Sequence, residues 1–192
     1  ELEGSITKQT AGISYTYAHG YPLPSLSLEE VVTLSHRNGV PVMVDAAAML
    51  PPKENLTKFV ELGADLVIFS GGKFIGGPQS PGLLFGNKNL VESALLNSGP
   101  NPSIGRPQKV GREELVGMVT ALELYVESDE NEIIDRMTRQ AELVCSKIGG
   151  IQGVNVAVKM DLQKYFVPTC VIGFQSNGSE KATSVADLMH EG

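Results

Sequence analysis

Cysteines, basic residues and long apolar runs are scarce in this sequence, and each scarcity disfavours a class of protein. Only Cys145 and Cys170 occur in 192 residues, without the paired spacing of zinc ligands, so neither a zinc site nor a disulfide framework is predicted and a cytoplasmic location fits best. Acidic residues outnumber basic ones by 22 to 15, and the net charge of −7 disfavours tRNA as a partner. No apolar run approaches the roughly 20 residues that cross a bilayer, so no membrane partner is expected.

The composition that is present is that of an ordinary globular protein. Apolar residues make up 42% of the chain and charged residues 19%, without low-complexity tracts. A chain of this length can bury a substantial core as one medium domain, or as one domain with part of a second.

Short apolar strands alternate with helices in the N-terminal half. Strands are predicted at 13–17, 42–44 and 66–69, and the last two are continuous apolar runs typical of strands covered on both faces. The order strand, helix, strand, helix, strand predicts an α/β fold with right-handed crossovers and a mainly parallel sheet.

The helices between these strands have their own start and stop signals. Ser27 and Glu30 predict a capping box at the start of the first helix, and Gly39 is placed to end it. Asn55 is predicted to cap the second helix, which Gly63 ends.

The pattern changes after a stretch rich in Gly and Pro at 98–109, which is predicted to be an irregular surface or active-site loop. Two helices are predicted at 111–126 and 131–148, with a domain boundary near 115. Alternating valines from Val154 to Val158 then predict a half-exposed strand of a separate, antiparallel sheet, and Ser179 is predicted to begin a last helix.

Two charged residues fall at the carboxyl ends of neighbouring predicted strands, where the functional groups of parallel sheets gather. They are Asp45 and Lys73. Asp45 can also be an ordinary turn cap, and Lys73 can be a solvated loop lysine. Four glycines weigh against the second interpretation, because glycine lets the backbone approach a ligand and offers amide donors to an anion. These glycines are Gly71, Gly72, Gly76 and Gly77.

Neither common nucleotide-binding motif fits this loop. A P-loop requires Ser or Thr after its lysine and a glycine five positions before the second glycine, but Phe74 follows Lys73 and Val67 stands at the glycine position. The glycine intervals also differ from the G-x-G-x-x-G dinucleotide fingerprint. Nucleotide binding is therefore not predicted here.

Three runs around these residues resemble one known family: GVPVMVDAAA at 39–48, GADLVIFSGGK at 63–73, and GGPQS at 76–80. They are similar to the bacterial selenocysteine synthase-like group (L-seryl-tRNA(Sec) selenium transferases) of fold-type-I pyridoxal phosphate (PLP) enzymes, which includes D-glucosaminate-6-phosphate ammonia-lyase-like proteins. The resemblance implies an aminotransferase-like α/β fold. Residues 1–115 would form the C-terminal part of the PLP-binding large domain, and residues 116–192 linking helices and an incomplete small α+β domain.

The resemblance implies a role for each candidate site residue. Lys73 would carry PLP as a Schiff base and then shuttle a proton, Asp45 would hold the pyridine nitrogen protonated, and Ser70 would donate to the cofactor phosphate. His19, after the first strand, can face the cofactor, or it can be an ordinary loop histidine. Arg106 and Lys109 match basic positions of the family's active-site loop. They would bind a substrate carboxylate or phosphate, although they can also be basic residues near a helix start.

A PLP-dependent lyase or transferase acting on a small amino substrate is therefore expected. The absence of Asn between Tyr15 and Tyr21, and the alanines at 46–48 where the synthases tend to have glycines, favour the lyase branch and an α,β-elimination on an amino acid or phosphorylated amino sugar acid. An L-seryl-tRNA(Sec) selenium transferase and a non-catalytic fragment or assembly module remain alternatives. The family's N-terminal half of the large domain has no counterpart before residue 13, so the chain alone is expected to be incomplete and to need a homo-oligomer.

Overall fold

The structure is a computed structural model, and it describes residues 2–17, 26–161 and 165–174. Contacts divide the chain into two compact units, Glu1–Ser128 and Asp129–Gly192. The described elements are, in chain order, α1 (Leu2–Ser5), β1 (Ile13–Thr16), α2 (Leu28–Arg37), β2 (Val42–Asp45), α3 (Asn55–Glu61), β3 (Leu66–Ser70), β4 (Gly82–Gly86), α4 (Lys88–Asn97), the 3-10 helix η1 (Arg106–Gln108), α5 (Arg112–Glu127), α6 (Glu130–Ile148), β5 (Val154–Asp161) and β6 (Tyr165–Phe174).

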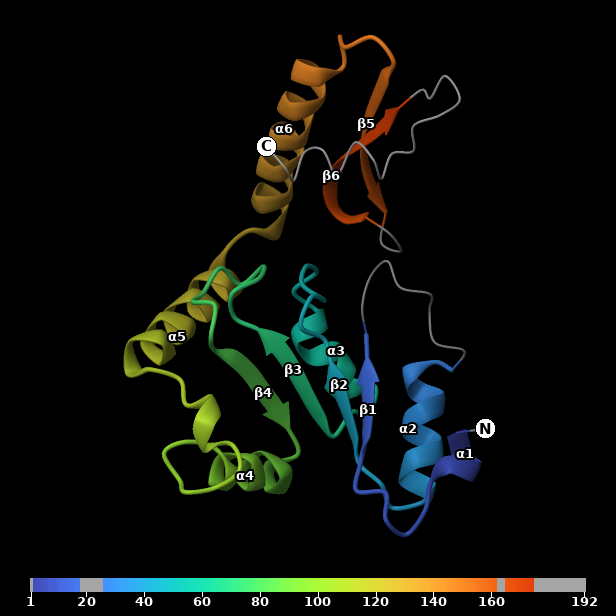
Figure 1. The fold of residues 1–192 in the computed structure, drawn as a ribbon, viewed down its shortest axis with the longest axis vertical. Coiled ribbons are helices and arrows are strands. Elements are labelled where there is room, and N and C mark those ends of the chain that lie inside the picture. Colours follow the sequence, from blue (N-terminus) through green and yellow to red (C-terminus); the bar gives the residue numbers. More distant parts are fainter. Residues whose placement is uncertain (1, 18–25, 162–164, 175–192) are drawn as a thin grey trace. The chain divides into compact units, whose positions relative to one another are not determined.

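The first unit is built on a four-stranded sheet with the order β1-β2-β3-β4. Figure 1 shows β1, β2 and β3 running in the same direction and β4 running against them, in agreement with the strand pairing. The predicted alternation of strands and helices and the mainly parallel sheet are confirmed. The carboxyl ends of β2 and β3 consequently lie at one edge of this sheet.

One face of the sheet carries the core. Val42, Val44 and Val67 are fully buried on it, and they pack in one cluster with α2 and with Phe59 of α3. Each large apolar side chain buried in this way stabilises the fold by about 1.5 to 3 kcal/mol. The opposite face is only half-buried, as at Ile68, so the prediction that the strands are covered on both faces is wrong for the described residues.

The start and stop signals of α2 are confirmed. Ser27 Oγ accepts a hydrogen bond from the Glu30 backbone N at 3.2 Å, and the Glu30 carboxylate accepts one from the Ser27 backbone N at 2.7 Å. A cap of this kind stabilises a helix by about 1 kcal/mol. Gly39 and Gly63 follow α2 and α3 with φ of 68° and 98°, the left-handed conformation that favours glycine at a helix end.

Asn55 does not cap α3. The N-cap residue is Glu54, and Asn55 is the first residue of the helix itself. The Asn55 side-chain amide is buried and donates to the Met49 carbonyl oxygen at 2.6 Å. The prediction failed because the loop after β2 contains a buried carbonyl group that needs a donor, and this need outweighs a local capping preference.

The second unit contains the predicted antiparallel hairpin. β5 pairs with β6 from Val154 opposite Phe174 to Asp161 opposite Tyr165, and α6 packs on both strands. The helices predicted at 111–126 and 131–148 are present as α5 and α6. The helix predicted from Ser179 lies outside the described residues.

The boundary between the two compact units falls after Ser128, at the end of α5, and thus later than residue 115. The correspondence of the units to a PLP-binding large domain and a small domain stays a prediction. Residues 98–109 are mostly irregular, but Arg106–Gln108 form the short helix η1, so the prediction of no regular structure is wrong for these three. Among the described residues, no helix combines the length and the apolar character needed to span a membrane.

Candidate active site

Asp45 and Ser70 end neighbouring parallel strands and share one face of the sheet. Asp45, the last residue of β2, aligns with Ile68 in β3, and Ser70 lies two residues further along β3. Because side chains alternate between faces along a strand, both project from the half-buried face. We refer to Asp45, Ser70 and Lys73 together as the carboxyl-edge residues.

Asp45 has a structural contact as well as a candidate chemical role. Its Oδ1 accepts a hydrogen bond from the Ala47 backbone N at 3.0 Å, which is the turn cap that the sequence left open. An ionised carboxylate has about four acceptor sites on its two oxygens, so one backbone contact leaves room for a second partner. The cap and a cofactor contact are therefore compatible.

Lys73 lies in the turn that follows β3, three residues after Ser70. The turn is closed by a hydrogen bond from the Gly76 backbone N to the Lys73 carbonyl oxygen at 3.0 Å. The Lys73 side chain is exposed, and in the described part of the chain Nζ makes no hydrogen bond or ion pair. The amine is accordingly available to a ligand at this edge.

Packing within the protein explains why two of the loop glycines are glycine. A Cβ atom at Gly71 would lie 2.3 Å from Met118 Sδ and 2.6 Å from the Pro81 carbonyl oxygen, both of which are impossible contacts. A Cβ atom at Gly72 would lie 2.8 Å from Gln79. The close approach that glycine permits here is therefore an approach to the protein itself, which the sequence could not distinguish from an approach to a ligand.

The amide groups of the loop are mostly occupied as well. The backbone N atoms of Gly71, Gly76 and Gly77 donate to the carbonyl oxygens of Pro81, Lys73 and Gly71 at distances of 2.9 to 3.0 Å. The expectation that these glycines offer amide donors to an anion is thus wrong for these three. A phosphate at this edge would depend on side-chain donors such as Ser70.

Helix α5 holds the glycine loop in place. Phe74 packs edge-on against Tyr125, with ring centroids 5.8 Å apart. The Glu114 carboxylate accepts hydrogen bonds from the Ser80 side chain and, at 2.9 Å, from the Gly111 backbone N. The Ser80 contact and then the Gly111 contact hold the pKa of Glu114 below its ordinary value.

The loop after Asp45 is tied to the same helix by Lys53. Its Nζ donates to the carbonyl oxygens of Val126, at 3.1 Å, and of Ser128, and lies 5.5 Å from the centroid of the Tyr125 ring. A cation at the carbonyl end of a helix stabilises it by about 0.3 to 1 kcal/mol. Helix α5 therefore positions the loops that follow both β2 and β3. No local sequence signal marks Lys53, because its partners are more than 70 residues away.

Arg106 and Lys109 stay within their own loop in the described contacts. Arg106 lies in η1, and its Nη1 donates to the Pro100 carbonyl oxygen. Lys109 is exposed and lies beside Gly99. Within the described residues, no hydrogen bond or ion pair joins either of them to the carboxyl-edge residues, so their substrate role stays a prediction. His19 lies outside the described residues.

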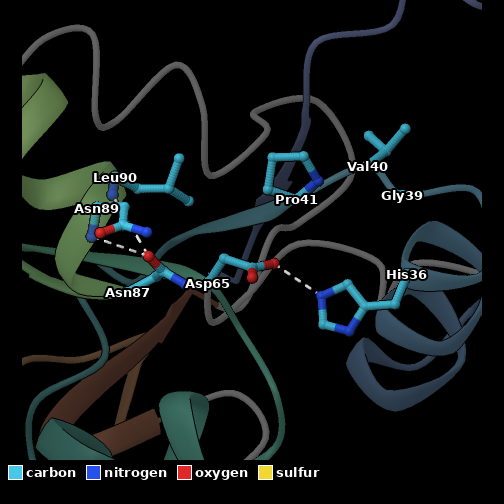
Figure 2. A pocket seen from close by; sticks show the side chains of 8 residues that line it. All are labelled: His36, Gly39, Val40, Pro41, Asp65, Asn87, Asn89 and Leu90. Atoms are coloured by element: carbon cyan, nitrogen blue, oxygen red, sulfur yellow. Dashed lines mark hydrogen bonds and ion pairs between the residues drawn. The ribbon is translucent and has the colours of Figure 1, made fainter.

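A cavity of about 460 Å³ lies at the opposite, amino edge of the sheet, near the starts of β2 and β3 (Figure 2). Most of the polar side chains around it already have partners within the protein. Asn87 caps α4 by accepting from the backbone N atoms of Asn89 and Leu90 at 3.0 and 3.4 Å, and His36 is bonded to Asp65. This cavity is therefore a structural feature rather than the candidate site.

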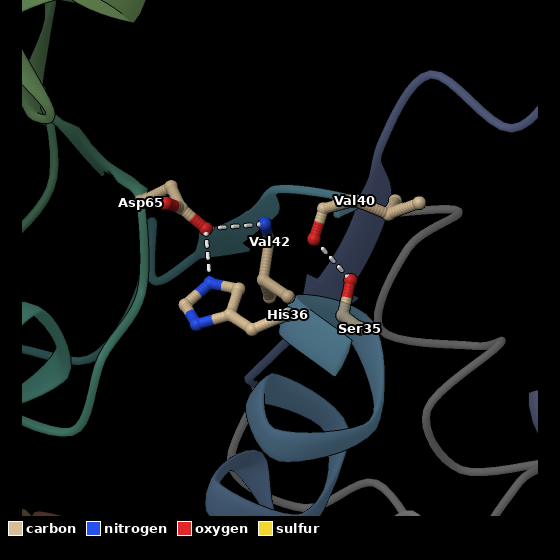
Figure 3. Close-up of polar contacts among 5 residues, drawn as sticks. All are labelled: Ser35, His36, Val40, Val42 and Asp65. Carbon is tan, nitrogen blue, oxygen red and sulfur yellow. Dashed lines mark hydrogen bonds and ion pairs between the residues drawn. The ribbon is translucent and has the colours of Figure 1, made fainter. Parts of the chain in front are cut away.

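Asp65 joins the elements that meet at the amino edge. Figure 3 shows its Oδ2 accepting from His36 Nε2 and from the Val42 backbone N, both at 2.8 Å. Beside it, Ser35 Oγ in α2 donates to the Val40 carbonyl oxygen at 2.5 Å. These bonds fix the start of β2 against β3 and α2, and a slip by one residue would turn Asp45 to the other face. Asp65 lies inside the run at 63–73, but no local sequence pattern indicates its role, because its partners His36 and Val42 are more than 20 residues away.

The fold places the chain in a class, that of the fold-type-I PLP-dependent enzymes. The solved structure of D-glucosaminate-6-phosphate ammonia-lyase has the same fold, with a TM-score of 0.73 and 27% sequence identity over 100% of this chain and 49% of that one. The family model of SelA, described as L-seryl-tRNA selenium transferase, matches residues 5–167, and the chain belongs to this family.

Three curated relatives have nearly equal similarity to this chain and different activities in their names. They are a 5'-C-glycyluridine monooxygenase-decarboxylase from Streptomyces (33% identity, 83% of this chain, 39% of the relative), D-glucosaminate-6-phosphate ammonia lyase from Salmonella typhimurium (32%, 84% and 41%) and an L-seryl-tRNA(Sec) selenium transferase from Aquifex aeolicus (33%, 74% and 33%). The chain thus spans less than half the length of these relatives. Because three activities occur at 32 to 33% identity, family membership alone does not select one reaction.

Proposed function

We propose that this chain is the lysine-bearing part of a PLP-dependent enzyme that removes the α-proton of a small amino compound and expels its β substituent. The observation that supports the proposal is the placement of Asp45 and Ser70 on one face at the carboxyl edge, with Lys73 three residues beyond Ser70. An acid, a hydroxyl donor and an exposed amine are the three side-chain types that PLP needs for its ring nitrogen, its phosphate and its aldehyde carbon.

The residues at this edge fit the cofactor on their own geometry. Asp45 is half-buried and keeps acceptor sites beyond its contact with Ala47, which suits a pyridine N–H. Ser70 projects from the same face. Lys73 follows Ser70 by three residues in the sequence, and its side chain is exposed. PLP, when bound, supplies an electron sink for the carbanion that remains after the α-proton departs.

Each residue then has a defined task. Asp45 keeps the pyridine nitrogen protonated, and a carboxylate neighbour raises the pKa of such a cation by about 1 to 3 units, or about 1.4 to 4 kcal/mol. Ser70 Oγ donates to the phosphate. Lys73 holds the cofactor covalently through Nζ and, once released, takes up the α-proton at the same atom. Arg106 and Lys109 bind a carboxylate or phosphate of the substrate.

The substrate class we favour is an amino acid or phosphorylated amino sugar acid that undergoes elimination. The similarity to the Salmonella typhimurium ammonia lyase and to a solved lyase structure supports this choice. The alternative is transfer of selenium to a seryl-tRNA, the activity that the description of the family model names. The net charge of −7 weighs against this alternative, since a tRNA surface needs clustered basic residues. We further propose a cytoplasmic homo-oligomer.

Borohydride trapping tests the assignment of Lys73. The protein carrying this sequence is saturated with PLP, reduced, digested and analysed by mass spectrometry. We expect one reduced phosphopyridoxyl group on the peptide that contains Lys73, its loss in Lys73→Ala, and its retention in the matched control Lys109→Ala. A label on Lys109 or on another lysine would overturn the assignment.

The reaction is tested separately, with two substrates. The PLP-loaded protein is assayed for ammonia and keto acid from a phosphorylated amino sugar acid, and for consumption of seryl-tRNA. Release of ammonia supports the lyase. Consumption of seryl-tRNA without ammonia release would replace it with the transferase.

A further inference from the structure

The two cysteines meet in the second unit, 25 residues apart in sequence. Cys145 lies in α6 and Cys170 in β6, and their Sγ atoms are 2.6 Å apart. Both side chains are half-buried. The proposed function uses neither of them, and no spacing in the sequence indicates that they pair.

The packing of α6 on the hairpin explains why they meet. Ala141, one helical turn before Cys145, is buried and shows which face of α6 points to the strands. Cys170 pairs across the hairpin with Val158, so the two side chains share the face that carries the half-buried valines of β5. The two thiols therefore project from facing surfaces of elements that already pack together.

We propose that Cys145 and Cys170 are a redox-sensitive pair, which a small-molecule disulfide such as oxidised glutathione converts to an intramolecular disulfide that ties α6 to β6. One cysteine thiolate attacks the glutathione disulfide, forming a mixed disulfide and releasing one glutathione thiolate. The second cysteine thiolate attacks the protein sulfur of the mixed disulfide and releases the other glutathione. The two cysteines lose two protons and two electrons in total, and the oxidant becomes two molecules of glutathione thiol.

The contact also makes the reaction depend on pH. The hydrogen bond with Cys170, and then burial, raise the pKa of Cys145 to about 11. Because the thiolate is the nucleophile, Cys145 is a poor attacking group near neutral pH. The rate of disulfide formation therefore rises with pH. No group of three or more His, Cys, Asp or Glu that could hold a metal ion occurs among the described residues.

The test uses the whole 192-residue chain in graded ratios of oxidised to reduced glutathione, without oxygen. Thiol counting, intact mass and peptide mapping under non-reducing conditions are the readouts. We expect the wild-type chain to lose both thiols and two hydrogens, to yield one cross-linked peptide containing Cys145 and Cys170, and to carry no glutathione. The single variants Cys145→Ser and Cys170→Ser should each retain one glutathione adduct instead.

A relocated thiol provides the matched control. In the double variant Val144→Cys with Cys145→Val, the thiol moves one position along α6 to a side chain that is 48% exposed. One residue turns about 100° around a helix, so this thiol should acquire a glutathione adduct and not cross-link to Cys170. Equal cross-linking in this variant would overturn the proposal, because it would show that any thiol on this part of α6 reaches Cys170 and that the contact of Cys145 with Cys170 is not required. Two glutathione adducts, two persistent thiols or only intermolecular disulfides in the wild type would overturn it as well.

Discussion

Asp45 combines a structural hydrogen bond with a position at the edge where a cofactor would lie, and a substitution can separate the two roles. Asparagine has the same shape as aspartate and keeps a carbonyl oxygen for the Ala47 backbone N, so Asp45→Asn should leave the turn intact. What it removes is the negative charge.

We therefore expect Asp45→Asn to keep its fold and part of its PLP, and to lose most of its turnover. Loss of 1 to 3 pKa units at the pyridine nitrogen corresponds to about a 10- to 1,000-fold fall in kcat. The measurement is kcat in the PLP-saturated whole protein that carries this sequence, with thermal unfolding as the check on the turn. Turnover close to that of the wild type would rule out the role of Asp45 as partner of the ring nitrogen.

Asp65 acts at the opposite edge, through the register of the strands. Asp65→Ala removes the acceptor for both His36 Nε2 and the Val42 backbone N, and it leaves the latter group without its partner in a half-buried position. A lost bond of this kind costs about 1 to 3 kcal/mol of the free energy of unfolding. His36→Ala removes only the more exposed contact, which is worth about 0 to 1 kcal/mol.

The expected order in urea unfolding is therefore a larger loss for Asp65→Ala than for His36→Ala. The double variant should resemble Asp65→Ala, because the acceptor is already absent. Equal losses in the two single variants would mean that Asp65 acts only through His36 and does not hold the start of β2.

At the scale of elements, strands and helices could be predicted from the sequence because their signals are local. The apolar run at 42–44 and the capping box of Ser27 and Glu30 involve neighbours in the chain, and both are confirmed. Features that depend on distant partners were missed. Asn55 satisfies a carbonyl group in the preceding loop, Lys53 binds the end of α5, and the two cysteines meet only after α6 packs on β6.

The candidate site shows the same division. The family motif indicated Asp45, Ser70 and Lys73, and the register of β2 and β3 brings the first two to one face. The glycines beside Lys73 were interpreted as ligand-contacting, yet two of them are needed for the packing of the turn against its own return segment and α5. The glycine pattern indicates that a side chain would not fit at these positions, but it does not indicate whether a ligand or the protein itself occupies the space.

The packing of the turn on α5 can be tested at Gly71. Its Cβ atom would collide with the buried side chain of Met118 and with the Pro81 carbonyl oxygen, so Gly71→Ala should lower the free energy of unfolding by about 1 to 3 kcal/mol. Gly4→Ala is the matched control, because no atom lies within 4 Å of its added Cβ and its backbone is not left-handed. The measurement is the free energy of unfolding of both variants in a chemical denaturant. An equally small loss in both would show that the turn accommodates a Cβ atom at residue 71 and contradict the prediction.

At the scale of the whole molecule, two apolar surfaces of the first unit lack a covering element in the described structure. Helix α5 is apolar nearly all round: Met118 and Tyr125 are buried, while Val116 and Val119 are 67% and 58% exposed. A helix with apolar residues on every side is normally buried. The sheet face of Asp45 and Ser70 is also only half-buried, and beside it lies a cavity of about 370 Å³ with a largely apolar lining that includes Met43 and Leu66.

These surfaces predict that the 192-residue chain self-associates and binds PLP weakly, without turnover. Contiguous exposed apolar surface favours association, and charges placed within it should oppose it. We therefore expect sedimentation to show oligomers or aggregates for the wild-type chain, and a shift towards monomer when Val116→Glu and Val119→Lys are combined. Glu113→Lys with Thr120→Glu, which changes exposed polar positions of the same helix, is the control and should leave the distribution unchanged.

Cofactor binding and turnover are measured on the same chain, by PLP titration with borohydride trapping followed by an elimination assay. A monomeric wild-type chain that is labelled stoichiometrically on Lys73 and turns over substrate would contradict the prediction, because its site would then be complete without any covering partner.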